Sequence, residues 1–405
     1  MRVVVRSTGC RLNQSEADMI MSRFRSNGHE CGEGQADLCV INTCTVTRQA
    51  DAKTVKLIRK LRKENPRARI IATGCMVETN REELESLGCI DEFVGNQEKS
   101  SIGQDQTCGS EFRYAPDRTR PFIKIQDGCD FNCSYCKVRL ARGPGRSERY
   151  EHVLAFAKSL AEQNYREIVL TGVNIGDYHD QGYRLKDLLK NLIKIPGIEQ
   201  VRLSSVEPTS IDKPLLSVLG HKKICKYFHV PLQSGSDKIL KAMNRPYTVR
   251  EYEDVVRELK TLDKEVIIGT DLITGFPNEE EEDFLQTLEF LKKNNIFYLH
   301  IFRYSKREHT PASLIKDNLN DKTRTDRAAV LDQYMHESKQ KYFESLTGKR
   351  IRIMVENKVK QNRYISSVSP DYLKVLLPLE LYRDKIGCLC DVRIERVMGQ
   401  DIYGQ

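Results

Sequence analysis

The sequence contains no long apolar run, no tryptophan, and only 7% aromatic residues among its 405 positions. No stretch approaches the roughly 20 consecutive apolar residues that a membrane helix needs, so we expect no membrane partner. The first residues, 1–7, are apolar but are interrupted by Arg2 and Arg6. They indicate a first strand rather than a signal peptide, and we expect a cytoplasmic protein.

A strong excess of one charge is also missing. The 65 Lys and Arg residues face 57 Asp and Glu residues, which leaves a formal charge of +8. A hydrophobic content of 39% and a charged content of 30% are typical of a soluble globular protein and exclude a disordered one. The length predicts two or three domains of about 150 residues each. A mild basic excess is compatible with a nucleic-acid partner, but many ordinary enzymes share it.

Cysteine is abundant, with 13 residues. In a reducing compartment this number does not indicate disulfides; it favours metal or redox chemistry for at least some of the thiols.

The first hundred residues alternate between strands and helices. Strands are predicted at 3–7, 38–42 and 70–73, and helices at 14–26, 47–63 and 80–87. This order is typical of a parallel sheet wound with helices, so an α/β domain is expected at 1–105. Residues 97–120 are polar and contain Gly103, Gly109 and Pro116, and we interpret them as a linker.

The middle of the chain repeats the alternation, with predicted strands at 122–125, 168–170, 201–203, 227–230, 266–268 and 299–302. Helices are predicted between them, for example at 152–163, 250–262 and 280–293. The pattern predicts a partial (β/α)6 barrel over 115–344, with its working face at the carboxyl ends of the strands. A polar helix at 323–345 precedes strands at 350–355, 363–367, 373–377 and 392–397, which predict a small β-barrel over 345–405.

Three cysteines follow the first predicted barrel strand closely, as Cys129-x-x-x-Cys133-x-x-Cys136. Three neighbouring thiolates can hold three irons of a cubane cluster and leave the fourth iron open. The amino and carboxylate groups of S-adenosylmethionine (SAM) suit that open iron, and reductive cleavage of SAM would give a 5′-deoxyadenosyl radical. Tyr135 can pack beside the adenine. The alternative is a structural zinc site, which normally takes four ligands.

A second set, Cys10, Cys44 and Cys75, is spread along the chain, but each cysteine follows a predicted parallel strand and precedes a helix. Ligands bind at this edge of a wound sheet, so the three turns can converge on one site. Gly9 and Gly74 permit tight turns there. We hypothesise a second cluster with three cysteine ligands; the alternative is three buried thiols that act as small hydrophobic residues.

The other cysteines carry no such pattern, and we interpret Cys39 as a core residue. Packing or incidental roles are expected for Cys31, Cys89, Cys108, Cys225, Cys388 and Cys390.

Together these motifs resemble the methylthiotransferase family of radical SAM enzymes, over essentially the whole chain. Matching strings lie at 127–130 (DGCD), 141–144, 146–147, 231–236 (PLQSGS), 269–277 (GTDLITGFP) and 304–307 (YSKR). The resemblance implies a SAM-binding 4Fe-4S cluster on Cys129, Cys133 and Cys136, an auxiliary 4Fe-4S cluster on Cys10, Cys44 and Cys75, and a C-terminal RNA-binding barrel of the TRAM type. It also implies two uses of SAM, as methyl donor to sulfur and as radical source.

Several polar or small residues near the ends of the barrel strands are candidates for contact with SAM. The glycine permits close backbone approach, and the polar side chains can form hydrogen bonds; for each, a purely structural role is the alternative. These candidates are Gly172, Asn174, Glu207, Gln233, Arg245 and Asp271.

The family contains three substrate classes: isopentenyl adenosine in tRNA, threonylcarbamoyl adenosine in tRNA, and an aspartate of a ribosomal protein. Segments 10–14 (CRLNQ), 42–47 (NTCTVT) and 202–208 (RLSSVEP) resemble the threonylcarbamoyl group. The resemblance therefore implies 2-methylthiolation of N6-threonylcarbamoyladenosine beside the anticodon. A rival from another class is a non-catalytic iron–sulfur factor that binds RNA or carries sulfur.

The predicted tail barrel begins with a cluster of cations, Lys349, Arg350, Arg352 and Arg363. Such side chains contact phosphates, and the nearby Tyr364 and Tyr372 can stack on unpaired bases, so we expect the tRNA anticodon stem-loop as partner. The alternative is a solvated basic surface with the tyrosines in the barrel core. The resemblance also implies an electron donor such as flavodoxin or ferredoxin.

Overall fold

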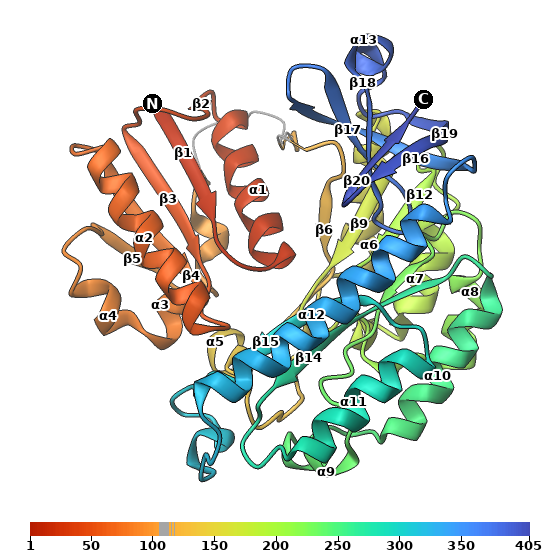
Figure 1. The fold of residues 1–405 in the computed structure, drawn as a ribbon. Coiled ribbons are helices and arrows are strands. Elements are labelled where there is room, and N and C mark those ends of the chain that lie inside the picture. The colour runs from red at the N-terminus through yellow and green to blue at the C-terminus, as the bar shows by residue number, and fades with distance from the viewer. Residues whose placement is uncertain (105–112, 115, 117) are drawn as a thin grey trace.

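The computed structural model describes residues 1–104, 113, 114, 116 and 118–405 (Figure 1). Cys108, Gly109 and the middle of the expected linker lie outside the described residues. The elements form three groups: an N-terminal parallel sheet, six parallel strands covered by helices, and a C-terminal closed barrel. Within the described part of the chain, no helix is both long enough and apolar enough to cross a membrane.

The N-terminal sheet has five parallel strands in the order β2-β1-β3-β4-β5. The predicted strands are confirmed as β1 (Arg2–Ser7), β3 (Leu38–Thr43) and β4 (Arg69–Gly74). The edge strands β2 (Glu30–Cys31) and β5 (Glu92–Val94) were not predicted, because two or three residues carry too little periodicity. Helices α1 (Arg11–Ser26) and α2 (Arg48–Glu64) bury their apolar residues in separate cores, α1 with Ile20 and Phe24 and α2 with Ile58 and Leu61.

Two short helices, α3 (Cys75–Thr79) and α4 (Arg81–Glu85), take the place of the single helix predicted at 80–87. Asn80 lies between them with non-helical backbone angles and ends the first helix.

The expectation of a plain linker at 97–120 is wrong in two places. Lys99 begins a 3-10 turn, Lys99–Ser101, and is buried, because its ammonium pairs with Glu16 at 2.6 Å. Tyr114 is also buried, with its ring at an edge-to-face centroid distance of 5.1 Å from Phe156. The polar composition of the segment concealed these two anchors.

The six predicted strands of the middle region are confirmed as β6 (Phe122–Lys124), β9 (Glu167–Thr171), β12 (Gln200–Leu203), β13 (Tyr227–His229), β14 (Ile267–Thr274) and β15 (Tyr298–Arg303). They form two parallel sheets, β12-β9-β6 and β13-β14-β15, as expected for a partial barrel. One apolar core, which includes Ile168, Val201 and Leu259, packs the strands against their helices. Those helices are α6 (Tyr150–Glu162), α7 (Leu185–Leu192), α8 (Lys213–Leu219), α10 (Val249–Leu262) and α11 (Glu281–Lys293).

Shorter elements complete this region. They are β7 (Gln126–Asp127), α5 (Val138–Arg142), β8 (Arg146–Ser147), β10 (His179–Asp180), β11 (Tyr183–Arg184) and α9 (Asp237–Ala242).

The predicted long helix, α12 (Asp321–Glu344), leads to a closed barrel in the order β16-β17-β18-β20-β19. The four predicted strands are present as β16 (Arg350–Lys360), β17 (Tyr364–Val368), β18 (Lys374–Pro378) and β19 (Leu389–Met398), and a small helix, α13 (Leu379–Tyr382), follows β18. The unpredicted β20 (Asp401–Gly404) closes the ring, because it pairs with both β18 and β19.

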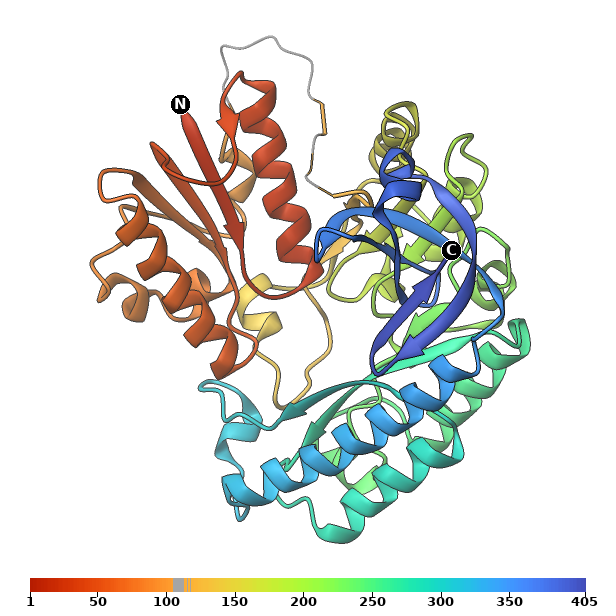
Figure 2. The same ribbon diagram turned by 45° about the horizontal axis from the view of Figure 1, so that its top comes forward.

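This barrel is docked on the middle region, and the start of α1 lies close to it (Figure 2). The fully buried guanidinium of Arg202 donates to Ser369 O at 3.0 Å and Pro370 O at 2.7 Å. The Tyr372 ring lies 4.1 Å from the guanidinium carbon of Arg202 and 4.8 Å from that of Arg11. The expectation that Tyr372 is available to stack on an RNA base is therefore wrong, because its ring is packed between protein cations.

Candidate functional site

The loop after β7 carries Cys129, Cys133 and Cys136 at the carboxyl end of the first barrel strand. Each thiol interacts electrostatically with its neighbours in the loop, so the three side chains converge. Burial raises the pKa of Cys129 to about 11 and that of Cys136 to about 12, and the neighbouring thiols contribute to both shifts. Raised pKa values such as those of Cys129 and Cys136 favour a bound cationic group, because a thiolate at these positions needs a positive partner.

Arg245 and Glu207 lie against this loop. Arg245 donates from Nη1 to Cys133 Sγ at 3.0 Å and forms an ion pair with Glu207. Tyr135 belongs to the same group, since its hydroxyl interacts with Arg245, Cys133 and Glu207. The structure thus brings three of the predicted SAM contacts together at Cys133.

Gly172 and Asn174 lie beside β7. A Cβ at Gly172 would come within 2.8 Å of Gln126 O, so packing against Gln126 already accounts for this glycine. Asn174 is buried and donates from Nδ2 to Asp177 Oδ2 at 2.6 Å, whereas its Oδ1 has no protein partner in the described part of the chain. A buried acceptor of this kind needs a donor, and a ligand can supply it.

Gln233 is placed by backbone contacts in the left-handed region, with φ of 69°. Its N donates to Asp271 O at 2.8 Å, and Ile273 N donates to its carbonyl at 3.0 Å. The predicted candidate Gln233 therefore lies directly beside Asp271 of β14.

The second set of cysteines converges through the sheet. β1, β3 and β4 are adjacent in register, with Ser7 opposite Asn42 and Thr43 opposite Gly74, so their following turns lie side by side. Burial raises the pKa of Cys44 to about 12, and the thiols of Cys10 and Cys75 contribute. Cys44 and Cys75 are buried, whereas Cys10 at the start of α1 is exposed.

The glycines next to these cysteines are required by close contacts. Gly9 has φ of 85°, and a Cβ there would overlap Cys44 Sγ. Gly74 has φ of 101°, and a Cβ there would lie 2.6 Å from Thr43 N. Both positions combine a left-handed backbone with no room for a side chain.

A buried charge network joins the two cysteine sets, and the sequence did not reveal it. Arg142, which ends the helix after Cys136, donates to Glu16 Oε1 at 2.9 Å and to Asp127 Oδ1 at 2.8 Å. Its other nitrogen donates to Asn13 Oδ1 at 2.5 Å and interacts with Cys75. Lys99 and Lys124 complete the neutralisation of Glu16. Asp127 and Arg142 fall within motif strings, but nothing in one sequence indicates Glu16 as their partner.

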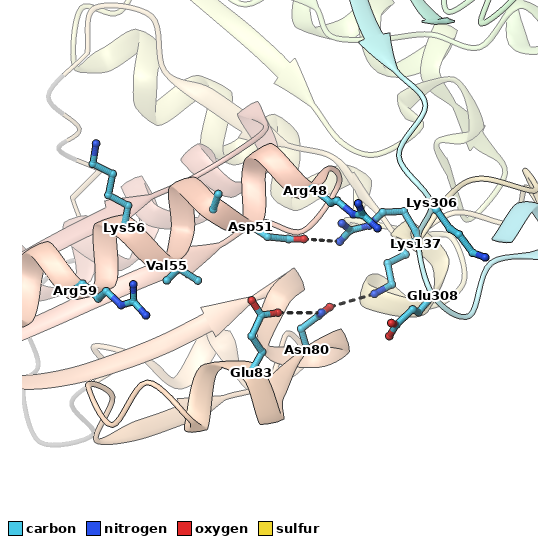
Figure 3. A pocket seen from close by; sticks show the side chains of 12 residues that line it. Arg48, Asp51, Val55, Lys56, Arg59, Asn80, Glu83, Lys137, Lys306 and Glu308 are labelled. Carbon is cyan, nitrogen blue, oxygen red and sulfur yellow. Dashed lines mark hydrogen bonds and ion pairs between the residues drawn. The ribbon is translucent and has the colours of Figure 1, made fainter. Parts of the chain in front are cut away.

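A pocket of about 710 Å³ opens between α2, α4 and the loop after β15. Figure 3 shows Lys56 and Arg59 along α2, and Asn80 between Glu83 and Lys137. Arg307 stabilises the turn that follows Cys44, because it donates to Thr45 O at 3.0 Å and pairs with Asp51 at 2.8 Å. The cations Arg48, Lys56, Arg59 and Lys306 form a basic rim beside this turn.

The predicted RNA-contacting cations Lys349, Arg350, Arg352 and Arg363 are all exposed on the C-terminal barrel. Arg352 pairs with Glu199 of the middle region at 2.5 Å. These four cations are distant in sequence from the six cysteines and form no hydrogen bond with any of them in the described part of the chain.

The remaining described cysteines fit packing roles. Cys39 is fully buried in the core of the N-terminal sheet, as predicted, and Cys225 is buried beside Arg202. Cys31, Cys89, Cys388 and Cys390 are half-buried.

The fold and the three-cysteine loop define a class of protein. A model of the radical SAM superfamily matches residues 123–291, and a model described as uncharacterized protein family UPF0004 matches residues 2–95. Among solved structures, the radical SAM methyltransferase TsrM from Kitasatospora setae superposes with a TM-score of 0.55 at 15% identity, over 77% of both chains. That likeness concerns the fold alone.

Full-length relatives narrow the class. The chain is 39% identical to threonylcarbamoyladenosine tRNA methylthiotransferase MtaB of Aquifex aeolicus, over 93% of this chain and 98% of that protein. It is 33% identical to tRNA-2-methylthio-N(6)-dimethylallyladenosine synthase of Natranaerobius thermophilus, over 98% and 95%. The chain belongs to the methylthiotransferase family of radical SAM enzymes.

Enzymes of this family use SAM and a 4Fe-4S cluster, and they carry a second cluster. The residues present fit these groups: two separate sets of three cysteine sulfurs, and the unpaired Asn174 Oδ1 near the first set. Soft thiolate donors of this kind suit iron–sulfur clusters.

Proposed function

We propose that this enzyme converts N6-threonylcarbamoyladenosine at position 37 of tRNA, beside the anticodon, into its 2-methylthio derivative. The observation that carries the proposal is the buried network of Arg142, Glu16 and Asn13, because Arg142 interacts with Cys75 of the second set and ends the helix that follows Cys136 of the first set. Methylthiolation needs radical formation and sulfur delivery at one substrate atom, and this network holds the two sites in a fixed relation. The named relatives supply the substrate class.

In this proposal, Cys129, Cys133 and Cys136 hold the SAM-binding cluster, and Cys10, Cys44 and Cys75 hold the auxiliary cluster. When bound, these groups supply the radical and the sulfur. Arg245 donates to the Cys133 sulfur, and Glu207 fixes the guanidinium. We assign contacts with SAM to Tyr135, Gly172, Asn174, Glu207, Gln233 and Arg245.

Two exposed basic surfaces support RNA as the partner. The first is the predicted one on the C-terminal barrel, with Lys349, Arg350 and Arg363. The second is α2, on which Arg48, Lys53, Lys56, Arg59 and Lys63 are exposed and form no ion pair with an acidic side chain in the described part of the chain. Because nothing in the fold requires this excess of like charge on one helix, we assign both surfaces to phosphate contacts of the anticodon stem-loop.

We further propose three functional divisions: the N-terminal methylthiotransferase unit at 1–105, the radical SAM unit at 115–344 and the TRAM-like unit at 345–405. The enzyme would act in the cytoplasm with flavodoxin or ferredoxin as electron donor. The exposed cation Lys306, which lines the pocket beside the turn of Cys44, would attract the acidic surface of such a donor.

Nucleoside mass spectrometry tests the proposal. tRNA from cells with and without the gene is digested and compared, and the gene carrying Cys133→Ala serves as the inactive control. We expect loss of only the 2-methylthio form of threonylcarbamoyladenosine. Loss of methylthiolated isopentenyl adenosine would transfer the activity to that substrate. Unchanged tRNA would contradict the proposal and direct attention to a ribosomal protein or to a non-catalytic role.

A further inference from the structure

The inner face of β14 and β15 carries side chains that are not part of the apolar core. Leu272 and Leu299 enter the core between strands and helices, so the alternating residues Asp271, His300 and Phe302 project from the opposite face. Asp271 and His300 are register partners. The side chain of His300 is 59% exposed, and Phe302 is 38% exposed.

A hydrogen-bond chain fixes the His300 ring. Asp271 Oδ1 lies 3.0 Å from His300 Nδ1 and 3.0 Å from Nε2 of the buried His229, and the two rings stack at 4.8 Å. Burial raises the pKa of the Asp271 carboxyl, but the two imidazoles outweigh it and hold that pKa below its ordinary value. His300 Nε2 has no protein partner within the described residues. Its position is fixed by the ring's contacts, and it is available to form a hydrogen bond with a ligand.

The charge of Asp271 interacts with residues that lie near each cysteine set. On one side, the charges of Asp271 and Glu207 interact, and Glu207 is paired with the Arg245 that contacts Cys133. On the other side, Tyr227 interacts electrostatically with both Asp271 and Arg11, the residue after Cys10. The charged group that holds His300 is thus connected through Glu207 and Arg245 to Cys133.

We propose that Asp271, His300 and Phe302 form a base platform that receives an unpaired purine of the RNA substrate. Phe302 stacks on the base, and His300 Nε2 hydrogen-bonds to its polar substituent. Proteins read bases that have left the stack by this combination of an aromatic face and fixed polar atoms. The inference rests on the proposed function, since it takes RNA as the substrate.

A metal site is the competing interpretation, because the ligand atoms of His229, Asp271 and His300 lie within 4.8 Å of one another. However, Asp271 Oδ1 already accepts from both rings, which satisfies the facing nitrogens without a cation. The exposed Phe302 beside His300 also has no use in a cation site.

The test measures RNA affinity of the anaerobic holoenzyme by fluorescence anisotropy. Two stem-loops are compared: one that carries threonylcarbamoyladenosine and one that is abasic at the same position. We expect base removal to weaken binding to the wild type about ten-fold or more. Phe302→Ala should weaken binding of the intact RNA to a similar degree and show little further loss with the abasic RNA, because the two changes remove the same interaction. His300→Ala should behave likewise with a smaller loss.

His336→Ala and Leu314→Ala are matched controls: His336 is an exposed histidine paired with Asp332 on α12, and Leu314 is an exposed apolar side chain. Both should retain wild-type RNA affinity and wild-type formation of 5′-deoxyadenosine without RNA.

Two results would overturn the platform. Base removal and Phe302→Ala could give fully additive losses, or the protein could bind one metal ion beyond its clusters that His300→Ala releases. A wild type that prefers the intact RNA but forms no methylthio product would refute the proposed function and leave the platform standing. A wild type that forms product while Phe302→Ala keeps the full preference would refute only the platform.

Discussion

One loop carries Cys129, Cys133 and Cys136, whereas Cys10, Cys44 and Cys75 lie on three turns separated by whole helices. The first set depends on local backbone: Cys129 N donates to Gly143 O at 3.1 Å, and Cys136 N donates to Cys133 O at 3.1 Å. The second set depends on strand register across β1, β3 and β4. The same grouping of three thiols therefore rests on a local motif in one case and on a sheet in the other.

The largest expected effect on activity comes from removing one cysteine from each set. Cys133→Ala should abolish reductive formation of 5′-deoxyadenosine, because it deletes a ligand of the proposed SAM-binding cluster. Cys44→Ala should preserve this reaction and abolish only the methylthiolated product. Each variant should lose about half of the bound iron of the reconstituted enzyme. Cys39→Ala, which alters a buried thiol outside both sets, is the control. Loss of 5′-deoxyadenosine in Cys44→Ala would contradict separate roles.

The charge network that joins the two sets gives the next largest effect. Arg142→Met leaves Glu16 and Asp127 buried with a missing cation, and should lower the free energy of unfolding by about 3 kcal/mol. Arg81→Met breaks only the exposed pair with Glu85 and should cost less than about 1 kcal/mol. Chemical denaturation of the anaerobic holoenzyme measures both. Equal losses in the free energy of unfolding would show that the network does not stabilise the structure more than an exposed ion pair does.

Substitutions on the two basic surfaces should give the smallest effect per residue, which is a loss of RNA affinity. Lys56→Ala with Arg59→Ala on α2, and Arg350→Ala with Arg363→Ala on the C-terminal barrel, should each weaken binding of the stem-loop and reduce the salt dependence of the affinity. Removal of one phosphate interaction should make the slope of log K against log salt shallower by about 0.7–0.9. Lys60→Ala is a control, because Lys60 pairs with Glu64 at 3.7 Å. A slope that changes for one surface only would assign the RNA to that surface.

Point substitutions are preferable to deletion of 345–405. Deletion would leave the fully buried Arg202 without the carbonyls of Ser369 and Pro370. An unpaired buried guanidinium would destabilise the middle region, so lost RNA binding and lost folding would become indistinguishable.

The strands and both cysteine turns could be predicted because buried parallel strands are apolar runs and their carboxyl ends meet at one edge. Contacts between distant polar residues could not. Glu16 and Arg142 are separated by 126 positions, and Lys99 pairs with Glu16 from a segment that looks like a linker. Likewise, Tyr372 resembles an exposed aromatic of a basic tail, and only the docking of the barrel shows its packing. The ligand roles of the six cysteines remain predictions.

The stacking of Tyr372 between Arg11 and Arg202 has a consequence for how the chain matures on the ribosome. Arg11 is translated among the first residues and directly follows Cys10, yet the ring that packs against it is translated among the last. A chain that terminates before Tyr372 leaves both cations uncovered, and cellular proteases act on such incompletely folded chains. The contact between the first helix and the C-terminal barrel thus cannot form until nearly all of the chain has been translated.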